Sequence, residues 1–281
     1  MSIAPTEEFA RLRKAYQEDE RQSSFNVLLL GESGAGKTFM LHTARKPVHI
    51  DSFDPGGTKG LRPWIDKGEI LVDTSYEGES PLKPFAYNKW KKDFQERVSS
   101  GYFSHIGTYC IDSATSWGEA IMNSILKKAN LAGKAPRFTH DYVPQKIEIR
   151  NMLRECLDLP CSFILTGHHE IMEDVDGEGR KALRFKFMTT GKGTVTIPLL
   201  FDEIYSLVST KSSGGVTRSL ITQNDGIHTA RSRLSKDGKF KVREDPDFKK
   251  LLQKAGESYD DKPLTPEEGG DDTKKEEEAA Q

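Results

Sequence analysis

An apolar run that ends in a glycine-rich turn constrains the fold of this chain more than any other feature. Residues 25–30 read FNVLLL, and residues 31–38 read GESGAGKT, which fits the pattern G-x4-G-K-[ST] completely. The apolar run predicts a buried strand, and the residues from Lys37 onward predict a helix. A strand that turns into a helix through glycines directs several backbone N–H groups toward one point, so the turn predicts an anion site.

The residues of this turn have distinct predicted roles around a chain of phosphates. The glycines allow the backbone N–H groups to face inward, and the start of the helix adds the positive end of its dipole. Lys37 is predicted to reach the β- and γ-phosphates, and the Thr38 hydroxyl is predicted to ligate Mg²⁺. We therefore predict that the chain binds a nucleoside triphosphate, ATP above all, with Mg²⁺. The predicted binding residues are Gly31, Glu32, Ser33, Gly34, Ala35, Gly36, Lys37 and Thr38.

Short apolar runs alternate with helical segments along the first 170 residues. Strands are predicted at residues 25–30, 47–50, 70–73, 108–112 and 162–166, and helices at residues 5–22, 37–45, 85–100, 117–130 and 145–159. This alternation predicts an α/β fold with a mainly parallel sheet flanked by helices. Asp-Gly pairs at residues 176–177, 225–226 and 237–238 then predict hairpins, so antiparallel strands are expected in the C-terminal half.

Three parts are predicted along the chain: an N-terminal helix (1–22), the α/β core (23–250) and a largely disordered tail (251–281). The helix carries Phe9, Leu12 and Tyr16 at helical spacing. We expect this stripe to pack on the chain's own core, with docking on a neighbouring copy as the alternative. Residues 257–281 hold ten acids and three lysines, a charge of −7, so the rest carries −2 − (−7) = +5. A basic body with an acidic tail is also found in nucleic-acid-binding proteins.

Other features of the sequence bear on its environment. The chain has no apolar run near the roughly 18 residues of a membrane span, and residues 1–14 resemble no secretory signal. Cys110, Cys156 and Cys161 lack the spacing of a zinc site, which predicts buried, reduced thiols. We therefore expect a cytoplasmic protein without membrane contact.

A magnesium ion bound to phosphates also requires a carboxylate at the end of a neighbouring strand. Asp112, which closes the run TYCID, is the predicted residue, with a helix N-cap as the alternative role. Residue 113 is serine rather than glutamate, so the group that activates water must come from elsewhere. The segment HIDSFDPGG offers Asp51 and Asp54, of which we favour Asp54, while turn formation remains an alternative for both.

His168 follows the apolar run SFILT and is predicted to sense the γ-phosphate. A polar side chain at the end of this strand would lie close to the last phosphate. Structural hydrogen bonding and a metal site shared with His169 remain alternatives.

Several segments together resemble a known family. They are GESGAGKT, IDSFDPGGTKG, CIDSATSW, ILTGHHE and TGKGTVTIPLLFDEIYSL. In this order they resemble phage-encoded AAA-type ATP-binding proteins with a shortened RecA core, some of which anneal single strands in recombination. The resemblance covers residues 23–242 and implies a RecA-like ATPase core that acts on single-stranded DNA in recombination, annealing or replication. It also implies host cytoplasm, a homo-oligomer, and a single-strand-binding protein as a further partner. Asp54 lies near the place where RecA-like enzymes carry a catalytic glutamate, but its spacing is one residue longer and its side chain one methylene shorter, which predicts slow hydrolysis.

Two loops combine cations with aromatic residues, a combination that suits single-stranded DNA because phosphates bind cations and bases stack on rings. The first loop, residues 131–144, and the second, residues 173–192, supply the candidates Arg137, Phe138, Arg180, Lys181, Arg184 and Lys186. The alternation in the second loop also fits a half-buried edge strand. The resemblance further suggests Lys192 and Arg231 as cations that reach a neighbouring copy's γ-phosphate.

Two other classes of function remain open on the sequence alone. P-loops also occur in small-molecule and nucleotide kinases, and a nucleotide-gated scaffold would bind ATP without hydrolysing it. Phosphate release stimulated by single-stranded DNA, transfer of the γ-phosphate to a nucleoside, and binding without turnover distinguish the three.

Overall fold

The computed structural model describes residues 5–18, 25–175, 181–187, 196–212, 214–235 and 238–264. Several sequence predictions lie outside these residues: the turns at residues 176–177, part of the 237–238 turn, the tail beyond residue 264, and the candidates Arg180 and Lys192. The backbone of Lys181, Arg184 and Lys186 is described, but their side chains are not.

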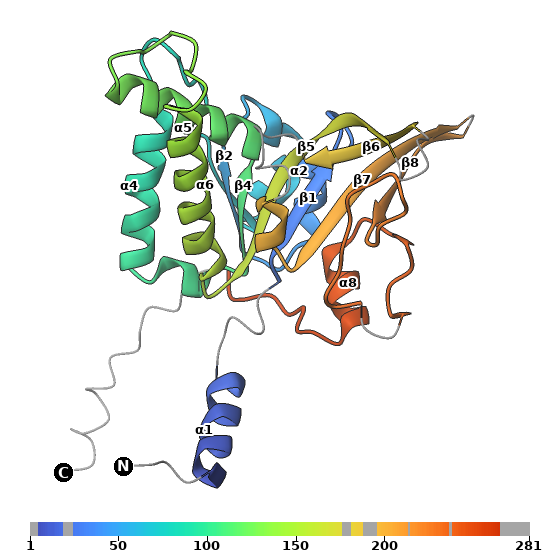
Figure 1. The fold of residues 1–281 in the computed structure, drawn as a ribbon. Coiled ribbons are helices and arrows are strands. Elements are labelled where there is room, and N and C mark those ends of the chain that lie inside the picture. The colour runs from blue at the N-terminus through green and yellow to red at the C-terminus, as the bar shows by residue number, and fades with distance from the viewer. Residues whose placement is uncertain are drawn as a thin grey trace, which may run out of the picture.

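A nine-stranded sheet forms the centre of the molecule (Figure 1). Its main path has the order β3-β2-β4-β5-β1-β7-β8-β9, and β6 pairs with β5. The strands from β3 to β7 along this path are parallel, whereas β6, β8 and β9 are antiparallel to their neighbours. The predicted α/β fold, a mainly parallel sheet flanked by helices with antiparallel strands in the C-terminal half, is confirmed. The strands are β1 Val27–Gly31, β2 Val48–Ser52, β3 Ile70–Asp73, β4 Thr108–Asp112, β5 Ser162–Val175, β6 Lys181–Phe187, β7 Glu203–Ser212, β8 Gly215–Ile221 and β9 Arg243–Glu244.

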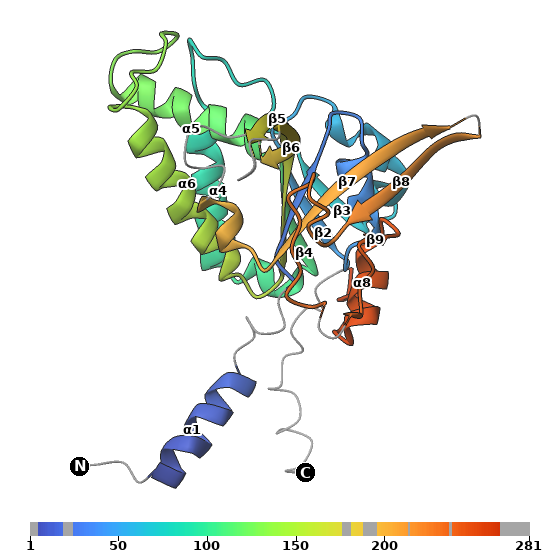
Figure 2. The ribbon, with the colours of Figure 1, turned by 45° about the vertical axis from the view of Figure 1, so that its right-hand side comes forward.

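Helices cover both faces of the parallel strands (Figure 2). Helices α4 (Ala86–Ser99), α5 (Ala114–Lys128) and α6 (Tyr142–Leu157) pack on one face, and α2 (Lys37–Met40) and α8 (Phe248–Ala255) lie on the other. Successive residues of a strand point to opposite faces, so Leu28 and Leu30 join the first core while Val27 and Leu29 join the second. Burial of each such side chain contributes about 1.5–3 kcal/mol. Strand β1 is therefore apolar from Val27 to Leu30, whereas β2 holds the buried His49 at its second position and ends in Asp51 and Ser52 at the carboxyl edge.

Helix α2 is shorter than the sequence predicts. A helix over residues 37–45 is wrong beyond Met40, where a 3-10 segment, η2 (Leu41–Thr43), takes over. Pro47 disfavours helical backbone at Lys46, and β2 begins at Val48, so the chain has no room for further turns.

Helix α1 (Pro5–Gln17) stands apart from the core (Figure 1). None of its residues is buried, and Phe9, Leu12 and Tyr16 are 68%, 51% and 65% exposed. The expectation that this stripe packs on the chain's own core is therefore wrong. Within the described residues, both faces of the sheet are already covered by other helices of the same chain.

The C-terminal segment is more ordered than the sequence predicts. Helix α8 crosses the boundary placed at residue 250 and buries Leu251, Leu252 and Ala255. Beyond it, the backbone N–H of Lys262 donates to the Lys46 carbonyl at 2.8 Å. The expected disorder is therefore wrong for residues 251–264, because three apolar residues of α8 pack into the core on one face of the sheet.

No Asp-Gly pair lies between the two strands of the β7–β8 hairpin. Strands β7 and β8 pair antiparallel from Ser206 with Ile221 to Ser212 with Gly215. Gly215 has φ of 118°, a backbone conformation that glycine adopts more readily than other residues. Asp225-Gly226 instead lies in a loop whose backbone bridges to β6.

Two further sequence predictions concern burial and membranes. Cys110, Cys156 and Cys161 are free and buried, as predicted. Within the described part of the chain, no helix is both long and apolar enough to cross a bilayer.

Candidate functional site

The glycine-rich turn lies at the carboxyl edge of the sheet, between β1 and α2. A cavity of about 500 Å³ opens above it. Eight predicted site residues line this cavity: Ser33, Gly34, Gly36, Lys37, Thr38, Asp54, Asp112 and His168. Gly31 lies below it in β1, while Glu32 and Ala35 line a separate cavity of about 170 Å³ beside β7. The fold thus brings together residues that are up to 135 positions apart in sequence (His168 and Ser33).

Glycine is required at two positions of the turn. A Cβ atom on Gly31 would lie 2.9 Å from the Leu207 carbonyl oxygen, so a side chain would push β1 and β7 apart. Gly36 has φ of 101°, which few other residues adopt. These constraints hold the backbone in the curved form that an anion site requires.

The Lys37 ammonium group lies at the mouth of the turn. Its Nζ donates to the carbonyl oxygens of Gly31 and Glu32 at 3.0 Å each and lies 3.5 Å from His168 Nδ1. Burial lowers the pKa of Lys37, and the charges of Asp112 and Asp54 oppose that shift. A buried ammonium whose partners are two carbonyl oxygens and a histidine nitrogen is well placed to bind an anion, because phosphate oxygens would return the solvation that it has lost.

Asp112 and Thr38 form the second part of the site. The Thr38 hydroxyl donates to Asp112 Oδ2 at 2.7 Å, and the Thr166 hydroxyl donates to Asp112 Oδ1. Burial raises the pKa of Asp112, although both hydrogen bonds lower it in part. A buried carboxylate next to a hydroxyl supplies the hard oxygen ligands that Mg²⁺ prefers, so these residues fit the ion.

The two aspartates after β2 lie in different surroundings. Asp51 is fully buried and accepts hydrogen bonds from Trp90 Nε1 at 2.9 Å, the Tyr109 hydroxyl at 2.6 Å and Arg97 Nη1 at 2.9 Å. Asp54 lines the cavity and accepts a hydrogen bond from the Ser116 hydroxyl. Asp54 can therefore contact a water molecule beside a phosphate, whereas Asp51 holds β2 and α4 together.

His168 lies directly beside the turn. It pairs in register with Gly31 across β1 and β5. Burial lowers the pKa of His168, and the charge of Lys37 lowers it further, so the ring is neutral at pH 7. Within the described residues, no group of three His, Cys, Asp or Glu side chains could hold a metal, so the alternative of a histidine metal site has no support.

The adjacent His169 gives the fold a predicted pH dependence. Burial and then the charges of His228, Lys37 and His168 lower the pKa of His169 to about 4. The unfolded chain binds this proton near pH 6.5 and the folded chain does not, so stability is complete above pH 6.5 and is lost as the pH falls toward 4. We expect the midpoint of urea unfolding to fall over this range in the parent and to fall less in His169→Gln. An equal fall in both proteins would contradict this, and His105→Gln, at an exposed position, is the control.

Comparison with known proteins gives the class of this site. A sequence model of a family described as AAA domain matches residues 23–234. The chain belongs to this AAA domain family. It therefore contains a P-loop NTPase domain, and domains of this type in general bind ATP and Mg²⁺.

Two other comparisons concern solved structures and curated proteins. A solved KaiC-like protein from the hyperthermophilic archaeon Pyrococcus horikoshii is similar to this AAA domain protein, with a TM-score of 0.39 and 14% sequence identity. The match covers 70% of this chain and 77% of that one. No curated protein matches the sequence.

The AAA domain holds other predicted residues away from the cavity. Arg137 Nε and Nη2 donate to Asp141 at 3.0 and 2.8 Å, so this ion pair occupies the guanidinium, whereas the neighbouring Phe138 is 87% exposed. Arg231 Nη2 donates to the carbonyl oxygens of Pro198, at 3.2 Å, and Phe201, at 2.5 Å. Because these contacts hold Arg231 within its own chain, the prediction that it reaches a neighbouring copy is not supported.

Three side chains near the site were missed in the sequence. Thr166 donates to Asp112, Ser116 donates to Asp54, and Arg218 Nε donates to the Ala35 carbonyl at 2.8 Å. Thr166 ends the apolar run SFILT in the sequence, which is a signal that could have been recognised. No local pattern marks Ser116 or Arg218, because their partners are 62 and 183 residues away.

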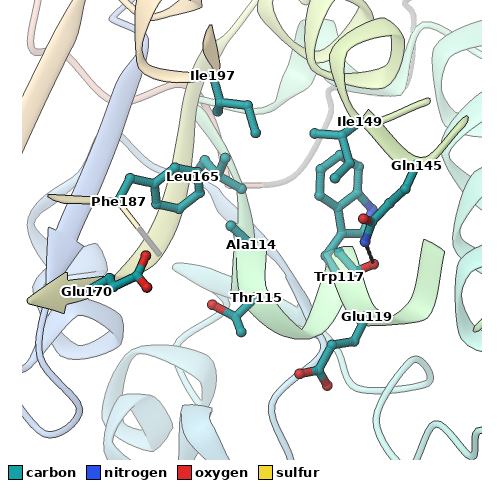
Figure 3. Close-up of a pocket in the computed structure, with 11 residues that line it drawn as sticks. Ala114, Thr115, Trp117, Glu119, Gln145, Ile149, Leu165, Glu170, Phe187 and Ile197 are labelled. Atoms are coloured by element: carbon teal, nitrogen blue, oxygen red, sulfur yellow. Dashed lines mark hydrogen bonds between the residues drawn. The ribbon is translucent and has the colours of Figure 1, made fainter. Parts of the chain in front are cut away.

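A further cavity, of about 250 Å³, lies among α5, α6 and β5 (Figure 3). Trp117 and Ile149 give it apolar walls, and Glu119 and Glu170 also line it. Trp117 Nε1 has no hydrogen-bond partner within the described residues. The carboxylates repel anions, so this cavity does not compete with the P-loop for phosphates.

Proposed function

We propose that the chain is an ATPase whose turnover is coupled to the binding of single-stranded DNA by an oligomer. The contact between Thr38 and Asp112, in the same cavity as the buried Lys37, supports the nucleotide part of this proposal. It places the oxygen ligands of a cation and a phosphate-binding ammonium group in one cavity of sufficient size for a triphosphate.

Each residue of the cavity has a proposed task. Lys37 exchanges the Gly31 and Glu32 carbonyls for phosphate oxygens, and Thr38 and Asp112 hold Mg²⁺, which neutralises charge on the phosphates. Asp54, held by Ser116, orients the attacking water. The neutral His168 ring contacts the γ-phosphate through Nδ1, the atom that now faces Lys37. The short Asp54 side chain is consistent with slow turnover.

The DNA part of the proposal rests on the course of β5. This strand continues from His168 to Val175 and pairs with β6, which carries Lys181, Arg184 and Lys186. One continuous ribbon thus joins the residue proposed to sense the γ-phosphate to three cations. Movement of His168 on phosphate release would be transmitted along the ribbon, because its backbone hydrogen bonds make it stiff.

Phosphate release measured with and without single-stranded DNA tests this proposal. We expect DNA to stimulate the parent several-fold, and we expect reversal of all three cations (Lys181→Glu, Arg184→Glu, Lys186→Glu) to abolish the stimulation without changing basal turnover. The matched control reverses three cations of α4, Lys89, Lys91 and Lys92. Transfer of phosphate to a nucleoside would instead indicate a kinase, and binding without turnover would indicate a scaffold. Unchanged stimulation in the β6 variant would show that these three cations do not couple DNA binding to turnover.

A further inference from the structure

Arg218, on β8, lies against the outer side of the P-loop. Its Nε donates to the Ala35 carbonyl at 2.8 Å. A Cβ atom on Gly36 would lie 2.9 Å from the same Nε, so the guanidinium group packs on the backbone of that glycine. Two strands of the C-terminal hairpin therefore bring a cation from 183 residues away to the phosphate-binding turn.

The direction of a bound nucleotide follows from the neighbours of β1. Gly31 pairs with His168 on β5 and with Leu207 on β7, so the two strands flank the P-loop on opposite sides. Asp112 and His168, which mark the γ-phosphate end, belong to the β4–β5 side. A linear triphosphate anchored there extends away from β5, and its nucleoside then lies on the side of β7 and β8.

We propose that Arg218 forms the nucleobase subsite of this chain, with its guanidinium plane stacked on the face of the base. This inference rests on the proposed binding of ATP. A guanidinium group is flat and weakly hydrated, and it stacks on aromatic rings better than an ammonium group does.

Two features suit Arg218 to this task. The hydrogen bond from Nε to the Ala35 carbonyl fixes the orientation of the plane, and the residue is exposed, so a ring can approach it. No ion pair found among the described residues involves Arg218. Stacking involves the face of the base rather than its edge, so the subsite takes either purine.

A comparison of two ligands, one with a base and one without, shows whether Arg218 contacts the base or the phosphates. Dissociation constants are measured for Mg·ATP and for Mg·tripolyphosphate, which has the phosphates but no nucleoside. We expect Arg218→Ala to weaken ATP binding about tenfold, the effect of losing one stacked base, and to leave tripolyphosphate binding within about twofold of the parent. Arg218→Lys, which keeps the charge but loses the plane, should show the same loss for ATP. Arg243→Ala, at an exposed arginine on the neighbouring β9, is the control and should bind both ligands as the parent does.

Other outcomes overturn the subsite. Unchanged ATP binding in Arg218→Ala would show that Arg218 does not contact the nucleotide. An equal loss for both ligands, or recovery of ATP binding in Arg218→Lys, would show that the residue acts through charge on the phosphates or through the shape of the turn. If the parent bound tripolyphosphate and ATP equally well, no base subsite would exist, although the phosphate site would stand. If the parent bound neither ligand, the proposed function would fail together with the subsite.

Discussion

Replacement of Lys37 by alanine is expected to weaken binding of Mg·ATP at least about a hundredfold while the fold is retained. The ammonium group would form charge-assisted hydrogen bonds with two phosphates, and each such bond contributes about 1.5–3 kcal/mol. The same substitution should not lower the stability of the folded chain, because burial lowers the pKa of Lys37 and so disfavours its charged form. Calorimetric titration with Mg·ATP measures the first effect, and thermal unfolding measures the second.

The control for this variant is Lys92→Ala. The Lys92 side chain is 74% exposed in a surface pair with Glu96, so its loss should change neither binding nor stability. ATP binding by Lys37→Ala within a few-fold of the parent would mean that the buried ammonium serves only to hold the carbonyls of Gly31 and Glu32.

Asp112→Asn should move function and stability in opposite directions. ATP hydrolysis with Mg²⁺ should fall about a hundredfold, the upper end of the effect of a lost partner around a metal site. The pKa of Asp112 is raised by burial, so stability is full below the pKa of the unfolded carboxyl group and declines as the pH rises through the folded value. At pH 7 without Mg²⁺, the neutral asparagine should therefore give a higher unfolding temperature than the aspartate.

Two measurements check Asp112: initial rates of phosphate release, and thermal unfolding without divalent ions. Asp66→Asn, at an exposed position, removes the same charge and should leave both unchanged. A lower unfolding temperature for Asp112→Asn would show that the hydrogen bonds from Thr38 and Thr166 outweigh the cost of the buried charge.

The central strands could be predicted from sequence because each is a short apolar run that ends in a polar residue. The predicted run at residues 108–112 coincides with β4, and Asp112 lies at its end as expected. The parallel order of the strands then brings Asp112 and His168 to the P-loop, since carboxyl ends of parallel strands share one edge. The residues of the phosphate cavity could be predicted because each lies in the glycine-rich turn or at or shortly after the end of a predicted strand.

Interactions between distant segments could not be predicted in this way. Arg218 reaches Ala35 because β7 pairs with β1 and carries β8 beside the P-loop, and nothing near residue 218 encodes that contact. Helix α1 has the apolar stripe of a packed helix, yet Phe9 and Tyr16 are exposed. Periodicity shows that a helix has an apolar face but does not say which surface covers it.

A structure of the chain with Mg²⁺ and a non-hydrolysable ATP analogue tests the central claim most directly. We expect the triphosphate in the cavity above residues 31–38, with Mg²⁺ about 2.1 Å from Thr38 Oγ1. Lys37 Nζ should leave the carbonyls of Gly31 and Glu32 and contact the phosphates. An analogue bound elsewhere, or a Lys37 side chain that stays on those carbonyls beside a filled cavity, would contradict the account.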